Sequence, residues 1–208
     1  MTIINGIIIN PMGGNKAEIF KDGTLAFSDS GKIQFVGNSS DFTVGENDKI
    51  IDYSDCIIIP GLIDLHTHLP QFSATGLGKG TLLDWLNTYI FPLEEKFNDE
   101  KFAKQNSDLF FEELLSHGTS YAMVYSAGFK VAACEAFKAA SRAGIRAMIG
   151  NPLMDMNVPE CFITSIEKML GDANELCNCW HGADSDRLKY IVTPRFAGSC
   201  SFRLMQRF

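Results

Sequence analysis

The 208-residue sequence has no long apolar run and no cluster of basic residues. No stretch approaches the roughly 18 to 20 apolar residues that cross a membrane, and no secretory signal opens the chain. Lys and Arg are scattered and the formal net charge is −7, which argues against a nucleic acid or an anionic membrane as partner. We therefore expect a cytoplasmic protein that acts on a small, neutral or weakly polar molecule.

The cysteines are too dispersed for a disulfide framework. The six are Cys56, Cys134, Cys161, Cys177, Cys179 and Cys200, unlike the dense pattern of a small secreted domain, so we expect free thiols. Cys177 and Cys179 precede His181, but residues two apart on a helix point away from each other, and no second cysteine pair completes a zinc site. We therefore expect these three residues to pack in the core and at the end of a helix, without a metal.

Two patterns of secondary structure divide the chain near Pro60. Before it, short β-type runs are broken by Gly, Asn, Asp and Ser, so residues 1–59 are expected to form a small β-sandwich-like module. After it, apolar strands alternate with helical segments, which is typical of parallel βα units in an α/β fold. The expected strands are 61–68, 119–127, 145–153 and 188–196, and the expected helices are 81–97 (interrupted by Pro92), 98–117 (capped by Asn98), 131–143 and 159–180.

Four βα units are too few for a closed barrel. A (β/α)8 barrel needs eight strands and typically about 250 residues. Residues 60–208 are therefore expected to form the first half of such a TIM-type barrel, truncated at its end. An open doubly wound sheet is the alternative, but no Gly-x-Gly-x-x-Gly follows the first strand and no Walker-type loop occurs.

Two histidines close the first strand of this second region, in residues 60–68 (PGLIDLHTH). On a strand, residues two apart project from the same face, so His66 and His68 can converge on one point. Imidazole nitrogen is a good ligand for zinc, and the pair is half of a metal site. A bare His-x-His is more often two histidines that share a face by chance. Here the pair follows a Pro-Gly break and lies at the end of an expected strand, and this position favours a metal site over a chance arrangement.

Residues 60–68 resemble the amidohydrolase superfamily, in which such a His-x-His at the end of the first barrel strand begins the metal site. Further segments resemble the guanine deaminase family in the same order: HLPQF (68–72), LLDWL (82–86), FPLEEKF (91–97), HGT (117–119), IVTPRF (191–196) and SCS (199–201). The resemblance runs from about residue 5 to the end of the chain. It implies a metal-dependent hydrolase that converts guanine to xanthine and ammonia in purine catabolism, with one Zn2+ per full site.

The resemblance also implies roles for individual residues. His66 and His68 are expected to bind zinc, and the substrate is expected to contact His68, Gln71, Arg195 and Phe196. The chemistry agrees, because zinc lowers the pKa of its bound water to near 7, forked arginine donors suit the O6 and N7 acceptors of guanine, and a phenylalanine can stack on the ring. For Arg195 the alternative is a surface ion pair, but barrel active sites are built at the C-terminal ends of strands.

The rest of the family's site is expected beyond Phe208. It comprises a His-x-x-Glu motif whose Glu shuttles the proton, a further histidine and an aspartate; His117 and His181 cannot replace them, since both precede strands. The alternatives are a catalytically silent fragment, or an amidohydrolase that deaminates a different purine or triazine ring. Trp85 and the Arg195-Phe196 pair favour guanine, and the cytidine deaminase signature is absent. For the full-length form we expect a homodimer.

Overall fold

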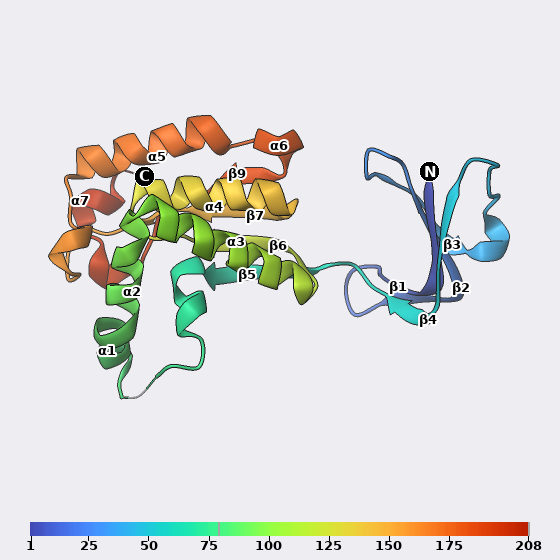
Figure 1. Ribbon diagram of the computed structural model, residues 1–208, viewed down its shortest axis with the longest axis horizontal. Helices are drawn as coiled ribbons and strands as arrows, with labels where there is room; N and C mark the ends of the chain where they lie inside the picture. The colour runs from blue at the N-terminus through green and yellow to red at the C-terminus, as the bar shows by residue number, and fades with distance from the viewer. Residues whose placement is uncertain (79, 208) are drawn as a thin grey trace. The chain divides into compact units, whose positions relative to one another are not determined.

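The computed structural model describes residues 1–78 and 80–207 of the chain (Figure 1). Contacts divide the chain into two compact units, Met1–Gly61 and Leu62–Phe208. Within the described residues, no helix combines the length and the apolar character needed to cross a membrane.

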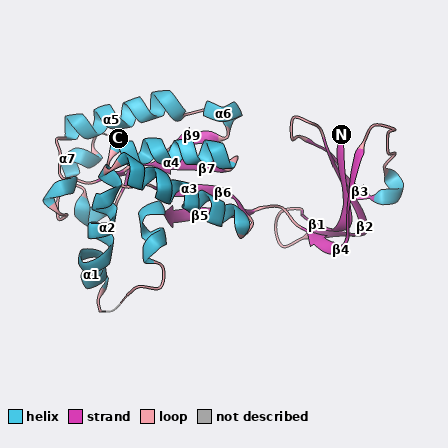
Figure 2. Cartoon of the chain, viewed as in Figure 1, coloured by secondary structure: helices cyan, strands magenta, loops and turns pink. Residues whose placement is uncertain are grey.

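The first unit is one four-stranded sheet with the order β3-β2-β1-β4 (Figure 2). Its described residues form one sheet. Turn residues and alternating apolar positions predict strands, but they do not say how many sheets the strands make. Strand β1 pairs antiparallel with β2 and parallel with β4. The strands are β1 (Thr2–Pro11), β2 (Ala17–Phe27), β3 (Ile33–Asn38) and β4 (Lys49–Ile58), with the 3-10 turn η1 (Ser39–Asp41) after β3.

The second unit is a mixed α/β fold around a parallel sheet with the order β5-β6-β7-β9. The strands are β5 (Leu62–His68), β6 (Thr119–Tyr125), β7 (Arg146–Gly150) and β9 (Leu188–Tyr190). A second, two-stranded sheet joins β8 (Pro152–Leu153) to β10 (Thr193–Pro194). Strand β8 follows β7 after a short break, and β10 follows β9 in the same way. The prediction of unbroken strands over 145–153 and 188–196 is therefore wrong, because each is divided into two.

Both strands break at a close approach of the backbone next to Gly150. A Cβ atom on Gly150 would lie 2.2 Å from the carbonyl oxygen of Ile191. The hydroxyl of Thr193 donates a hydrogen bond to the carbonyl oxygen of Asn151 (2.8 Å). The absence of a side chain at residue 150 therefore lets the segments around Gly150 and Ile191 pack closely against each other.

The helices lie close to the expected positions, with three differences. The helix expected over 159–180 begins only at Ile166, where the Ser165 side chain caps α5. The helix expected over 81–97 is four consecutive short elements, and Pro92 closely follows a π-helical turn, so the regular α-helical hydrogen bonding is interrupted there, as expected. Asp99, not Asn98, caps α3 by accepting a hydrogen bond from the Phe102 N–H (2.7 Å). The helical elements are η2 (Leu69–Ala74), α1 (Leu82–Trp85), η3 (Leu86–Ile90), α2 (Phe91–Glu95), η4 (Lys96–Asn98), α3 (Glu100–Ser116), α4 (Lys130–Ala143), η5 (Glu160–Phe162), α5 (Ile166–Trp180), α6 (Ala183–Asp186), η6 (Ala197–Ser199) and α7 (Phe202–Met205).

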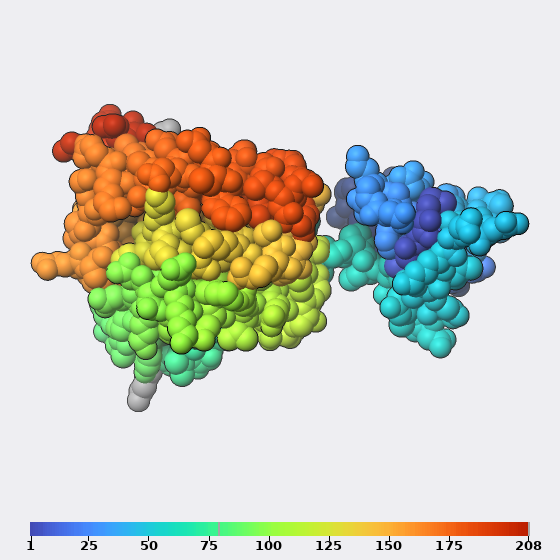
Figure 3. Space-filling view, turned by 45° about the horizontal axis from the view of Figure 1, so that its top comes forward, coloured from blue at the N-terminus to red at the C-terminus, as the bar shows by residue number. Residues whose placement is uncertain are grey.

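The main core of the second unit lies between its sheet and the helices α3, α4 and α5. Helix α4 lies between the other two at the surface (Figure 3), and its buried face is rich in alanine, which lets it sit close to the strands. The fully buried Phe111 and Phe137 fill the space between helices and sheet together with Ile149 of β7. This packing fixes the strands, whose carboxyl ends carry the candidate site.

Candidate functional site

The end of β5 brings two imidazoles together. The Nε2 atoms of His66 and His68 lie 3.3 Å apart, and the ring centroids lie 5.1 Å apart. Strand β5 shifts its register against β6 between Asp64 and Thr67. Within this irregularity, the Asp64 carboxylate accepts a hydrogen bond from the His66 backbone N–H (3.0 Å). The side chain of Asp64 therefore fixes the backbone from which the two rings project.

The separation of the two nitrogens suits one metal ion. Two ligands at about 2.1 Å from a tetrahedral zinc ion have their nitrogen atoms about 3.4 Å apart, and the 3.3 Å between His66 and His68 is close to this value. The residues therefore fit two ligand positions of a zinc site. In the part of the chain that the structure describes, no group of three or more His, Cys, Asp or Glu side chains is placed to hold a metal.

His68 is held by its surroundings more firmly than His66. Its ring stacks on Tyr125 of β6, with centroids 4.6 Å apart and an angle of 13° between the planes. Burial, the nearby charge of Arg195 and the neighbouring His66 lower the pKa of His68 to about 4. At neutral pH this imidazole is therefore uncharged, the form that binds metal ions.

A cavity of about 840 Å³ opens beside the histidine pair. It is lined by each of the site residues predicted from the sequence, namely His66, His68, Gln71, Arg195 and Phe196. Gln71 comes from η2, and Arg195 and Phe196 directly follow β10. The rest of the wall is mostly apolar: Phe72, Ala74, Leu77, Leu82, Leu83, Trp85, Leu86, Phe110 and Leu114. A mostly apolar wall with a few converging polar groups is typical of sites for small organic molecules.

Arg195 is fixed on three sides. Its Nη1 group lies 2.8 Å from both carboxylate oxygens of Glu94, and both side chains are almost fully buried. Its guanidinium carbon lies 5.2 Å from the centroid of the Phe91 ring, within the range of a cation–π contact. Its backbone N–H donates to the carbonyl oxygen of Leu153 at the end of β8 (3.1 Å). Arg195 thus forms an ion pair, but in the interior and not on the surface.

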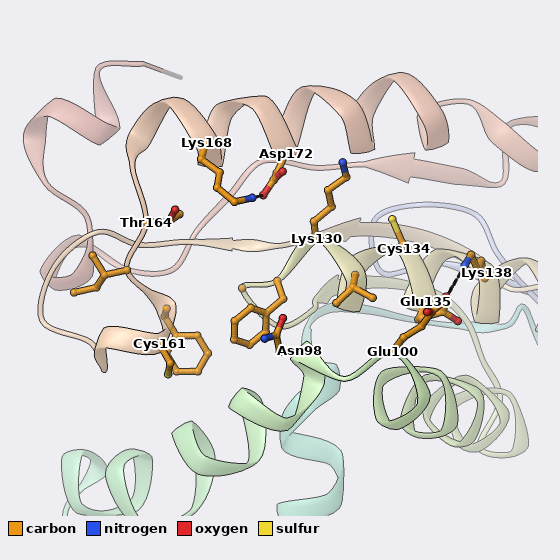
Figure 4. A pocket seen from close by; sticks show the side chains of 15 residues that line it. Asn98, Glu100, Lys130, Cys134, Glu135, Lys138, Cys161, Thr164, Lys168 and Asp172 are labelled. Carbon is orange, nitrogen blue, oxygen red and sulfur yellow. Dashed lines mark hydrogen bonds and ion pairs between the residues drawn. The ribbon is translucent and has the colours of Figure 1, made fainter.

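A second cavity, of about 650 Å³, lies between η5, α4 and α5 (Figure 4). Its three lysines are each paired with a carboxylate: Lys130 with Glu175, Lys138 with Glu135, and Lys168 with Asp172. These pairs neutralise one another, so the cavity presents no concentrated charge to a ligand. The chemistry therefore favours the cavity beside the histidines.

The sequence pattern of the Amidohydrolase family matches residues 57–208, which include the histidine pair and the cavity beside it. The chain belongs to the amidohydrolase family. Among curated relatives, guanine deaminase from Escherichia coli (strain K12) is 32% identical over 183 residues, covering 87% of this chain and 41% of that protein. Guanine deaminase from Dictyostelium discoideum is 29% identical over 219 residues, covering 98% of this chain and 49% of that protein. The chain spans about half the length of the curated relatives it matches.

Solved structures show the same relationship. This amidohydrolase chain aligns with guanine deaminase from C. acetobutylicum, described with bound guanine in the active site, with a TM-score of 0.89 and 33% identity. That alignment covers 98% of this chain and 48% of the other. E. coli guanine deaminase aligns with a TM-score of 0.92 and 29% identity, covering 99% and 49%. The second unit, with its parallel sheet, therefore matches the fold of TIM-type amidohydrolases.

Two residues next to the candidate site were not predicted from the sequence. Glu94 lies 101 positions from its partner Arg195, and no local pattern announces a contact over that distance. Tyr125 is opposite His68 in the register of β5 and β6. The position of Tyr125 could have been predicted from the sequence. Neighbouring parallel strands end at the same edge of a sheet, and Tyr125 ends the strand that follows the histidine strand.

The remaining histidines have structural positions. His117 is the C-terminal cap of α3, and its side chain is 72% exposed. His181 caps α5, with its Nδ1 atom 3.2 Å from the carbonyl oxygen of Tyr190. Cys177 is half-buried and Cys179 is exposed on the same helix. These residues are absent from the lining of the histidine cavity.

Proposed function

We propose that this chain supplies part of a zinc centre and the purine pocket for the hydrolytic deamination of guanine to xanthine and ammonia. The observation that carries the proposal is the convergence on one cavity of the ligand pair His66 and His68 with Gln71, Arg195 and Phe196. These residues come from segments more than a hundred positions apart. The likeness to guanine deaminases, one of them described with bound guanine, supports guanine as the ligand.

The strands β5, β6, β7 and β9 would be the first four of a (β/α)8 barrel. The parallel order of these strands and the structural likeness to guanine deaminases support this. In such a barrel the active site lies at the carboxyl ends of the strands. His66 and His68 end β5, and Arg195 and Phe196 follow β10, so the candidate site lies where the barrel would place it.

His66 and His68 would hold the zinc ion through their Nε2 atoms. Zinc bound there would supply Lewis-acid activation of a water molecule for hydrolysis at the amino-bearing carbon of the purine. A catalytic zinc usually has three protein ligands, so the pair provides two of them. Tyr125 keeps the ring of His68 in place.

The other residues bind and orient the purine. The guanidinium of Arg195 offers parallel donors to the adjacent O6 and N7 acceptors of guanine. Phe196 is 48% exposed at the cavity and offers a face for stacking. Gln71 presents both a donor and an acceptor from η2, and the apolar wall around Trp85 excludes water from the ring.

Equilibrium dialysis of the 208-residue chain with radiolabelled guanine and adenine tests this function. We expect guanine to bind more tightly, since adenine presents an amino group where guanine presents O6. Phe196→Ala should weaken guanine binding by about tenfold, the scale of a lost aromatic stacking contact. The matched control is Phe202→Ala, because Phe202 is 77% exposed and does not line the cavity. Equal binding of the two purines, or equal effects of the two variants, would contradict the proposal.

A further inference from the structure

The side chain of Glu94 reaches the candidate site only through Arg195. Glu94 does not line the cavity, and it is 2% exposed at the inner side of the arginine. Burying a carboxylate is costly unless it is paired and hydrogen-bonded. Both of its oxygens contact a single nitrogen, Nη1 of Arg195. The carboxylate therefore binds one end of the guanidinium and leaves the other end available.

The available end carries the donors that a planar ligand needs. In the part of the chain that the structure describes, Nε and Nη2 of Arg195 make no hydrogen bond. Among the described side chains, the fully buried polar atoms that lack a hydrogen-bond partner belong to Ser107 and Ser126, and not to Arg195. Because Nε and Nη2 of Arg195 also lack a partner, they must reach solvent, and Arg195 is one of the residues that line the cavity. They form one edge of a planar guanidinium whose opposite side is bound.

We propose that Glu94 is a positioning residue that holds the Nε and Nη2 donors of Arg195 toward the carbonyl edge of a purine in the His66–His68 cavity. This inference rests on the proposed function. Free arginine side chains lose rotamer freedom when they bind a ligand, and a side chain already held in place loses less. The Phe91 ring, 5.2 Å from the guanidinium carbon, restricts the plane of the group, while Glu94 restricts its rotation in that plane.

Glu94 also sets the charge that the ligand meets. Arg195 alone would place a buried positive charge beside the two histidines, which favours an anionic ligand. The ion pair makes the wall neutral overall while keeping the directed donors. A neutral purine with adjacent carbonyl and ring-nitrogen acceptors fits this arrangement better than an anion does. The preference for guanine over adenine should therefore depend on Glu94 as well as on Arg195.

The test compares Glu94→Gln with Glu95→Gln, its exposed neighbour on α2, in equilibrium dialysis with guanine and adenine. Glu94→Gln should weaken guanine binding by about tenfold and reduce the preference for guanine over adenine, while Glu95→Gln should change neither. NMR spectra of the arginine guanidinium groups report how freely each group rotates. The Arg195 group should rotate freely in Glu94→Gln and stay restricted in Glu95→Gln, as in the wild type. Guanine binding and an Arg195 signal that both match the wild type would overturn the inference and leave the proposed function standing.

A double-mutant comparison keeps the test decisive if Glu94→Gln alone does not fold. Arg195→Gln and the double variant Glu94→Gln/Arg195→Gln both lack the arginine, so a residue that acts through Arg195 has nothing left to position. Equal guanine affinity in these two proteins supports the inference. A further loss in the double variant shows that Glu94 acts independently and overturns it. If the wild-type chain binds no guanine, the proposed function fails, and this inference fails with it.

Discussion

The imidazole of His68 stacks on the phenol ring of Tyr125, with centroids 4.6 Å apart and planes inclined by 13°. The two residues are opposite each other on the neighbouring parallel strands β5 and β6. The stack restricts rotation of the imidazole, and its Nε2 atom consequently stays beside that of His66. Tyr125 thus contributes to the ligand pair without offering a ligand.

Replacing Tyr125 should loosen this arrangement. We expect Tyr125→Leu to lower zinc affinity several-fold, because residues that orient a metal ligand typically change affinity by about 10- to 100-fold when they hydrogen-bond it, and stacking is weaker. Zinc competition against a chromophoric chelator measures the change. Tyr121→Leu is the control, since Tyr121 lies four positions earlier on β6 and, among the described residues, has no recorded ring contact with either histidine. Equal zinc affinity in both variants would show that the stack does not matter.

The substitution His68→Ala should abolish zinc binding by this chain. A single imidazole that remains, His66, is a poor site for zinc, which usually has three or four protein ligands. Wild-type binding should itself be weak, because no third ligand accompanies the pair among the described residues. Dialysis followed by elemental analysis gives the zinc content. His117→Ala, a change at the exposed cap of α3, should leave it unaltered. Stoichiometric zinc in His68→Ala would refute the assignment of ligands.

The mixed α/β fold with its parallel sheet was predictable, and the structure confirms it. After Pro60, apolar runs alternate with helical stripes, and this pattern is typical of parallel βα units. The breaks within strands were not predictable. Residues 145–153 read as one apolar run, but the close approach of Gly150 to Ile191 is a tertiary contact that no local pattern contains.

The candidate site divides in the same way. His66 and His68 were visible because their contact is local, and strand geometry alone brings residues two apart to one face. Arg195 and Phe196 came from the resemblance, and their position at the end of an expected strand favoured a pocket over a surface ion pair. The buried partner of Arg195 was out of reach. Glu94 is one of many acidic residues in the chain, and only the folded structure shows that it is buried.

Gly198 makes room for the ring that we place against the purine. A Cβ atom at this position would lie 2.7 Å from Cε2 of Phe196, closer than carbon atoms approach. Gly198→Ala should therefore push the Phe196 ring from its place and weaken guanine binding, with little loss of stability because Phe196 is half exposed. Dialysis with guanine and a thermal melt separate the two effects. Gly171→Ala, where a Cβ would meet nothing, is the control. Unchanged guanine affinity in Gly198→Ala would contradict the role of Phe196.

Asp108 gives the fold a defined dependence on pH. It accepts hydrogen bonds from Lys104 on its own helix (2.7 Å) and from Nε of Arg142 on α4 (3.1 Å). Burial opposes ionisation of this carboxyl, but the hydrogen bonds and charges of Lys104 and Arg142 outweigh it, so the pKa of Asp108 is lowered. A lowered pKa in the folded state means that the ionised form stabilises the fold above the ordinary value of about 4 and that this stabilisation is lost at lower pH.

We therefore expect Asp108→Asn to reduce the free energy of unfolding at pH 7 by about 0.5–1 kcal/mol, the scale of a partly exposed ion pair. The difference between variant and wild type should shrink as the pH falls below about 4, because the unfolded wild-type chain then takes up a proton before the folded one. Urea unfolding of both proteins at several pH values measures it. Glu112→Gln, an exposed acid on the same helix for which the structure records no ion pair among the described residues, should show no such trend. A difference that stays constant from pH 7 to pH 3 would mean that the Asp108→Asn substitution destabilises the fold through packing and not through lost charge.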